Sequence, residues 1–148
     1  MARIREKSAV YRERLKSKGL RHTQPRERIL AYLDRKNVHP TPEELYRGLR
    51  KKGHDIGLST IYLNLHVLRD VGLVREFKDP KGQTRFDGWS KPHHHLFCRV
   101  CGRVEDLPAG QAPDPMEAKE DVEAATDWRL ESAQITYWGL CPRCKGEA

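Results

Sequence analysis

A short stretch of the chain, residues 92–106, concentrates side chains of the kinds that bind metal ions. It holds three histidines, one C-x-x-C pair and two carboxylates, namely His93, His94, His95, Cys98, Cys101, Glu105 and Asp106. A second C-x-x-C pair, Cys141 and Cys144, lies near the C-terminus. Thiolates are soft ligands, whereas imidazoles and carboxylates are harder. The stretch therefore predicts two metal sites of different chemistry.

The four cysteines predict a structural zinc site. A C-x-x-C turn directs two sulfurs at one ion, and two such turns complete a closed tetrahedron. The alternative, a redox dithiol, needs only one pair. The N-terminus is basic and has no apolar leader segment, so we expect a cytoplasmic protein with reduced thiols. We predict that Zn²⁺ bound by Cys98, Cys101, Cys141 and Cys144 holds the second half of the chain together, and that loss of one thiolate unfolds that half.

The histidines predict a separate site. On a strand, His93 and His95 point to one face and His94 to the other. Two imidazoles are only half a metal site, and such a pair is often incidental. Three further candidate ligands are His39, Asp87 and Asp106. Imidazole and carboxylate ligands without sulfur suit iron, manganese or zinc in a regulatory or catalytic role.

Charge is divided unevenly along the 148 residues, whose formal net charge is +7. Residues 1–87 hold 21 Lys and Arg against 11 Asp and Glu, so residues 88–148 are mildly acidic. A basic front half favours a polyanionic partner such as nucleic acid. No apolar run approaches the length of a membrane span, so we expect no membrane partner.

The front half must place its basic residues on a DNA-binding scaffold. Residues 2–18 carry a weak helical stripe, and Thr23 begins a second helix. The run Thr41-Pro42-Glu43-Glu44 is a capping box that starts a third, and a further helix runs from Leu58 or Ser59 to Asp70. A hairpin follows, with a type I turn at residues 79–82. This order predicts a winged helix-turn-helix, with a simple helical bundle as the alternative.

The helix ending at Asp70 is the predicted recognition helix. Ile61, Leu65 and Leu68 share one face and should be buried. The other faces carry side chains that suit bases and phosphates. The residues expected to contact DNA are Arg21, Ser59, Thr60, Tyr62, Asn64, His66, Arg69 and, at the tip of the hairpin, Lys81.

The back half of the sequence has strand-like segments, unlike the mainly helical front half. We predict strands over residues 95–100, 104–107 and 133–140, and a short helix from Asp114 to about Thr126. The fold class is therefore α+β, with a winged-helix domain over residues 1–87, a hinge over 88–92 and a small α/β metal-binding domain over 93–148.

Motifs along almost the whole chain resemble the ferric uptake regulator family. They are residues 19–26 (GLRHTQPR), 39–41 (HPT), 59–62 (STIY), 72–74 (GLV), 85–87 (RFD), 93–95 (HHH) and both C-x-x-C pairs. The resemblance implies a homodimeric, metal-dependent repressor that binds a pseudo-palindromic double-stranded DNA operator and uses the second domain to dimerise. It also implies a regulator and not an enzyme.

The resemblance also implies a regulatory metal site. Carried over by position, its ligands are His39, Asp87, His93, His95 and Asp106, and its ion is Fe²⁺ or Mn²⁺, with Zn²⁺ as a third option. Such an ion joins the two domains and favours one arrangement of them. Glu105, next to Asp106, leaves the assignment open by one residue. Many relatives carry a histidine where this chain has Ser132-Ala133, so a third metal site is left open.

The carboxylates favour one branch of this family. Peroxide-sensing members resemble the chain in carrying Asp at the positions of Asp87 and Asp106, whereas iron-uptake regulators usually carry Glu. In a peroxide sensor, peroxide reacting at bound Fe²⁺ oxidises a ligating histidine, here His93 or His39, and no other small molecule is a substrate. An iron- or manganese-responsive uptake regulator is the second interpretation. A His/Asp metalloenzyme and an RNA-binding zinc ribbon are less favoured, because no catalytic motif or row of stacking aromatics accompanies the ligands.

Overall fold

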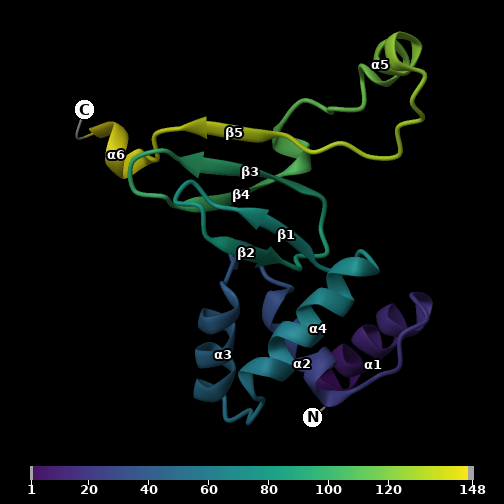
Figure 1. Ribbon diagram of the computed structural model, residues 1–148. Helices are drawn as coiled ribbons and strands as arrows, with labels where there is room; N and C mark the ends of the chain where they lie inside the picture. The colour runs from purple at the N-terminus through teal and green to yellow at the C-terminus, as the bar shows by residue number, and fades with distance from the viewer. Residues whose placement is uncertain (1, 147–148) are drawn as a thin grey trace. The chain divides into compact units, whose positions relative to one another are not determined.

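The computed structural model describes residues 2–146, which form two compact units that divide between Ser90 and Lys91. The N-terminal unit contains helices α1 (Ala2–Ser17), α2 (Gln24–Leu33), α3 (Pro42–Lys51) and α4 (Leu58–Asp70), then strands β1 (Arg75–Lys78) and β2 (Thr84–Asp87). The C-terminal unit contains β3 (His93–Cys98), β4 (Val104–Pro108), the 3₁₀ turn η1 (Ala109–Gln111), α5 (Lys119–Thr126), β5 (Thr136–Gly139) and α6 (Pro142–Gly146). Figure 1 labels the helices α1–α6 and the strands.

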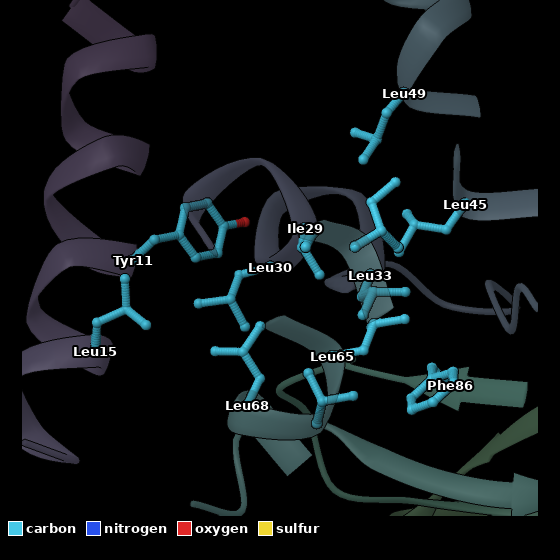
Figure 2. Close-up of a cluster of buried hydrophobic side chains, with 12 residues drawn as sticks. Tyr11, Leu15, Ile29, Leu30, Leu33, Leu45, Leu49, Leu65, Leu68 and Phe86 are labelled. Atoms are coloured by element: carbon cyan, nitrogen blue, oxygen red, sulfur yellow. The ribbon is translucent and has the colours of Figure 1, made fainter. Parts of the chain in front are cut away.

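The N-terminal unit is built around one apolar core, to which all four of its helices and β2 contribute (Figure 2). Leu30, Leu45 and Leu65 are fully buried, each with 0% exposure. Burying one such side chain contributes about 1.5–3 kcal/mol. Phe86 adds the wing to this core. The predicted burial of Ile61, Leu65 and Leu68 is confirmed.

Local signals set the ends of these helices. The Thr23 hydroxyl accepts a hydrogen bond from the backbone N–H of Arg26, and Thr41 forms the predicted capping box with Glu44. Gly19, with φ of +70°, lets the chain turn out of α1. The apolar stripe predicted on α1 consists of Ile4, Val10, Tyr11 and Leu15, and it is only half buried. Tyr11 and Leu15 are in the core, whereas Ile4 and Val10 are 72% and 55% exposed.

The wing is the antiparallel hairpin of β1 and β2. Arg75 lies opposite Asp87, and Lys78 lies opposite Thr84. The Gly82 N–H donates to the Asp79 carbonyl at 2.9 Å and closes the predicted turn. Helices α2–α4 followed by this hairpin form a winged helix-turn-helix, as predicted.

The C-terminal unit is a three-stranded sheet in the order β4-β3-β5. Strand β3 pairs with β4 antiparallel and with β5 parallel. Its cluster of buried apolar residues consists of Cys98, Cys141 and Cys144, with Cys101 and Leu140 packed against them. Sulfur therefore takes the place that aliphatic side chains fill in the N-terminal unit.

The predicted start of α5 at Asp114 is wrong, because the helix begins at Lys119. The Asp114 carboxylate accepts the N–H of Met116 at 2.8 Å, and its carbonyl accepts the N–H of Glu117. These bonds close a local turn that competes with the helix. Within residues 2–146, no helix is both long enough and apolar enough to cross a membrane.

Candidate metal centres and nucleic-acid interface

The four cysteines come together at one end of the C-terminal sheet. Cys98 ends β3, and Gly102, with φ of +76°, donates its N–H to the Cys98 carbonyl at 3.0 Å and closes the turn that carries Cys101. Cys141 follows β5, and Cys144 lies in α6. One ligand atom from each cysteine lies within 4.8 Å of the other three. The two C-x-x-C pairs, far apart in sequence, therefore form one cluster, as predicted.

The spacing of the sulfurs fits zinc. The Sγ atoms of Cys101 and Cys141 lie 3.8 Å apart. Two thiolates bound to one Zn²⁺ at about 2.3 Å and at the tetrahedral angle lie about 3.8 Å apart. The cysteines are free of disulfides, and three of the four are buried. The cluster thus meets the distance and ligand requirements of a closed structural site.

Backbone N–H groups favour the thiolate form of Cys98, which is the form that binds a metal cation. The N–H groups of Cys101 and Cys141 point at the sulfur of Cys98 and lower the pKa of that thiol to about 6. The Cys141 sulfur raises the pKa of Cys144 to about 12. Neighbouring thiolates repel one another, so the four sulfurs ionise together only when a cation balances their charge.

A second group of ligand types lies elsewhere in the C-terminal sheet. His95 lies directly opposite Asp106 in the β3–β4 register, and His93 lies on the same face. The Nε2 atoms of His93 and His95 are 3.6 and 3.4 Å from Asp106 Oδ1. All three residues are buried. Ligands bound to one ion at about 2.1 Å are separated by about 3–3.5 Å, so these distances fit a shared metal.

Hydrogen bonds to the other ring nitrogen orient these imidazoles. His93 Nδ1 donates to the Lys91 carbonyl at 2.6 Å, which leaves the Nε2 lone pair available to a metal. The Gln134 amide lies 3.3 Å from His95 Nδ1 and donates to the His93 carbonyl. His94 instead accepts the backbone N–H of Ile135 at its Nδ1.

The structure distinguishes Asp106 from its neighbour Glu105. Glu105 lies opposite Leu96 in the register and pairs with Arg103 at 3.3 Å. The Asp106 side chain has 0% exposure and faces the two histidines. Asp106 therefore remains the candidate ligand of the two.

The N-terminal unit carries the other two candidate ligands. His39 and Asp87 are buried, with 8% and 2% exposure. The His39 ring meets the edge of Phe77 at a centroid distance of 5.6 Å. The Phe86 N–H donates to the Pro40 carbonyl at 3.0 Å, so the segments that carry His39 and Asp87 are hydrogen-bonded neighbours.

Most of the predicted DNA contacts lie on the surface of the N-terminal unit. Ser59, Tyr62 and His66 are exposed on α4, Thr60 is half-buried, and Arg21 and Lys81 are exposed. The Tyr62 hydroxyl donates to Glu43 at 2.5 Å, in a cavity of about 570 Å³ between α3, α4 and the wing.

Two of the predicted contacts have partners within the protein. Asn64 is 8% exposed, so its predicted place on an open face is wrong. Its Oδ1 accepts from Arg26 Nε at 3.1 Å, and its Nδ2 donates to the Thr60 carbonyl. Arg69 forms ion pairs with Glu76 on β1 and with Asp70. Arg69 thus joins α4 to the wing.

The roles of Gln134 and Glu43 are not evident from the sequence. Gln134 precedes β5 in a segment without regular structure, and no periodicity marks it as a neighbour of the histidines. In the sequence Glu43 belongs only to a helix-start signal, whereas in the structure its carboxylate also accepts a hydrogen bond from the Tyr62 hydroxyl. Both roles arise from contacts between segments that are distant in sequence.

Comparison with known proteins gives consistent matches along the chain. Residues 17–138 match the sequence model of the ferric uptake regulator family. The chain is 33% identical over 133 residues to the peroxide-responsive repressor PerR of Staphylococcus epidermidis, covering 90% of this chain and 87% of that protein. The PerR of Staphylococcus aureus (strain Mu50) is 33% identical over 131 residues, with 88% and 86% covered.

Solved structures agree with these sequence matches. The Vibrio cholerae ferric uptake regulator is 31% identical, with a TM-score of 0.66, and the match covers 88% of this chain and 98% of that one. The Campylobacter jejuni peroxide stress regulator is 27% identical, with a TM-score of 0.71 and coverage of 92% and 97%. The Pseudomonas aeruginosa regulator solved with manganese is 26% identical, with a TM-score of 0.71 and coverage of 90% and 98%.

Proposed function

The chain belongs to the ferric uptake regulator family, and we propose that it is a peroxide-responsive repressor whose operator binding requires a regulatory Fe²⁺ or Mn²⁺ ion. Members of this family are metal-dependent transcriptional regulators and not enzymes, so the chain is a regulator of this kind. We place it in the cytoplasm, where bacterial operators are found. The buried group of His93, His95 and Asp106 carries this proposal.

Two metal ions have separate tasks in this proposal. Zn²⁺ is held by Cys98, Cys101, Cys141 and Cys144, and it stabilises the C-terminal unit permanently. The regulatory ion takes His39 and Asp87 from the N-terminal unit and His93, His95 and Asp106 from the C-terminal unit. Support comes from the burial of all five side chains and from their oxygen and nitrogen chemistry, which suits Fe²⁺ and Mn²⁺.

Ligands from both units turn metal binding into a switch. Residues 88–92 act as the hinge between the two units. An ion that binds all five ligands favours the arrangement in which they converge, and it shifts the equilibrium only by its differential affinity for that arrangement. Two copies of α4 in a homodimer would then enter successive major grooves of a pseudo-palindromic operator.

The ligand set favours peroxide sensing over simple metal sensing. Both carboxylates are aspartates, and all four cysteines lie in the other cluster. The PerR relatives are peroxide-responsive by name. Fe²⁺ held by these residues would supply the redox chemistry that cleaves the O–O bond of peroxide. Overall, one oxygen atom of peroxide would be added to an imidazole carbon of His93 or His39 and the other would leave as water. The oxidised ring would be a poorer ligand, which weakens the ligand set.

Operator binding and histidine oxidation test this proposal together. A high-affinity duplex is first selected from random DNA in the presence of Mn²⁺. Its affinity for the zinc-loaded protein is then measured with and without Mn²⁺ by fluorescence anisotropy. His93→Ala should abolish the metal dependence and retain zinc. His94→Asn is the control, because it keeps an acceptor for the Ile135 N–H, and it should respond to Mn²⁺ as the wild type does.

The same protein loaded with Fe²⁺ is then exposed to low peroxide and its peptides are weighed. We expect one added oxygen atom on the peptide containing His93 or His39 and loss of operator binding. An unmodified protein that still binds the operator would instead identify an iron- or manganese-responsive uptake regulator. Metal-dependent binding that survives His93→Ala would contradict the proposed switch itself.

A further inference from the structure

Arg85 joins three parts of the N-terminal unit through one guanidinium. Its Nε donates to Asp79 in the wing turn at 2.6 Å. Its Nη1 donates to the His39 carbonyl at 2.8 Å and to Glu44, in the first turn of α3, at 3.2 Å. Its Nη2 donates to the side chain of Gln83 at 3.1 Å. One side chain thus contacts the loop of a predicted metal ligand, the start of α3 and the wing.

The Arg85–Asp79 pair at the centre of this network lies largely away from solvent, whereas the Glu44 side chain is 42% exposed. The side chain of Arg85 is 20% exposed and that of Asp79 only 1%. A buried ion pair is tolerated only when its geometry is good and its remaining polar atoms are hydrogen-bonded. The planar guanidinium presents its N–H groups in a fixed fork, so its acceptors are held at fixed positions relative to one another. Movement of one acceptor therefore changes the positions of the others.

Asp79 connects Arg85 to the tip of the wing through hydrogen bonds. Its Oδ1 accepts the backbone N–H groups of Lys81 and Gln83 at 2.8 and 2.9 Å, while its Oδ2 accepts from Arg85. These bonds fix the turn that presents Lys81, the residue predicted to contact DNA from the wing. Arg85 and the backbone of the wing tip thus share the Asp79 carboxylate as acceptor.

The other end of the network is the proposed metal site. Arg85 lies in β2 two residues before Asp87, and its guanidinium holds the backbone of His39. An ion that binds His39 and Asp87 fixes both the loop and the end of β2. The same loop continues into the capping box of α3, through Thr41 and Glu44.

On the basis of the regulatory site proposed above, we infer that Arg85 is a positioning residue that couples metal occupancy at His39 and Asp87 to the wing and to α3. Arg85 thereby sets how strongly the ion raises operator affinity. Coupling of this kind is a ratio of affinities, and by linkage DNA raises metal affinity by the same factor. Loss of Arg85 should therefore lower this ratio, while metal and DNA each still bind.

The first test is the ratio of operator affinities with and without Mn²⁺, measured on the zinc-loaded full-length protein. Arg85→Lys keeps the charge, but its ammonium is a point charge and cannot hold the three segments together. We expect the ratio to fall by about 2- to 30-fold, with little change in affinity without Mn²⁺. Arg50→Lys is the matched control, because Arg50 is exposed on α3 and bonded to Tyr46.

Hydrogen exchange gives a second readout that does not involve DNA. In the wild type, Mn²⁺ should slow amide exchange in the wing turn, which includes Lys81 and Gln83. The slowing should be absent in Arg85→Lys and present in Arg50→Lys. A residue that only stabilised the fold would change exchange equally with and without Mn²⁺.

The possible results separate this inference from the proposed function. A wild-type protein that does not respond to Mn²⁺ overturns the proposed function, and this inference with it. A wild type that responds and an Arg85→Lys variant with the same ratio and the same slowing overturn the role of Arg85 alone. If Arg85→Lys does not fold, Asp79→Asn replaces it. Its single side-chain oxygen can still accept from Lys81 and Gln83, but the NH₂ group that replaces the second oxygen cannot accept from Arg85. A full Mn²⁺ response in Asp79→Asn would also overturn the coupling.

Discussion

The buried carboxylate of Asp79, in the N-terminal unit, is stabilised by several hydrogen-bond donors. Burial raises the pKa of this carboxyl, but hydrogen bonds from Arg85 and from the N–H groups of Gln83 and Lys81 lower it more, so the net pKa lies below the ordinary value of 3.8. A carboxylate with a depressed pKa stabilises the folded state at pH values above the unfolded pKa. That contribution is lost as the pH falls through the folded pKa.

Asp79→Asn should therefore destabilise the protein in a pH-dependent way. At pH 7 we expect the free energy of unfolding to fall by about 1–3 kcal/mol, because Arg85 loses a buried acceptor. The difference from the wild type should shrink as the pH falls below about 4. Urea unfolding followed by far-ultraviolet circular dichroism measures this difference.

Asp70→Asn is the matched control for Asp79→Asn. The Asp70 side chain is 67% exposed and pairs with Arg69 on the surface. Exposed ion pairs contribute little, so its effect should stay below about 0.5 kcal/mol. Equal effects of the two substitutions would contradict a stabilising role for the buried network.

Elements of the C-terminal unit depend on the cysteine cluster for their packing. The cluster joins the end of β3, the turn before β4, the end of β5 and helix α6. Strand β5 itself is exposed along its whole length, and no residue of α5 is buried. The apolar burial that holds the N-terminal helices together is therefore scarce here.

Cys144→Ser should accordingly unfold the C-terminal sheet. Structural zinc contributes about 10–16 kcal/mol to small zinc-binding units, which exceeds the stability expected of this sheet without metal. Hydrogen exchange should show loss of protection in β3, β4 and β5, while α2 and α4 stay protected. Ser132→Ala, an exposed change in the same unit, should leave protection intact. A protected sheet in Cys144→Ser would show that zinc is not its main support.

The C-terminal sheet has two edge strands, β4 and β5, at which a second copy of the chain can pair. The β4 edge carries Glu105 and Asp106 and ends at Pro108, features that discourage pairing. Strand β5 has the uncharged sequence TYWG and an exposed Trp138. The carbonyls of Ile135 and Gly139 accept hydrogen bonds from the N–H groups of His95 in β3 and of Arg99 just after it. By alternation, the backbone polar groups of Trp138 therefore face the open edge. Strand β5 is therefore the edge that we expect to pair in the homodimer.

Trp138→Pro should weaken that dimer. Proline removes the outward N–H and leaves the bonds to β3 in place. Two symmetry-related hydrogen bonds of about 1 kcal/mol each would be lost, so the dissociation constant should rise roughly tenfold or more. Sedimentation measures it. Trp138→Thr is the control, because it also loses the indole but keeps the N–H. Equal dissociation constants for the two variants would show that the dimer forms elsewhere.

Features that depend on residues close together in the chain could be predicted from the sequence. The capping box at Thr41, the turn at Asp79 and the pairing of the C-x-x-C motifs follow from local geometry and ligand chemistry, and the structure confirms each of them. The winged-helix order could be predicted for the same reason. The helix predicted at Asp114 failed because its carboxylate closes a competing turn.

Contacts between side chains that are far apart in sequence became apparent only in the folded structure. It buried Asn64 against Arg26, bound Arg69 to Glu76, and chose Asp106 over Glu105 as the neighbour of His95. It also gathered His39, Glu44 and Asp79 around Arg85. Local patterns give residue types and periodicity, whereas strand register and the burial of a polar group depend on the packing of the whole unit.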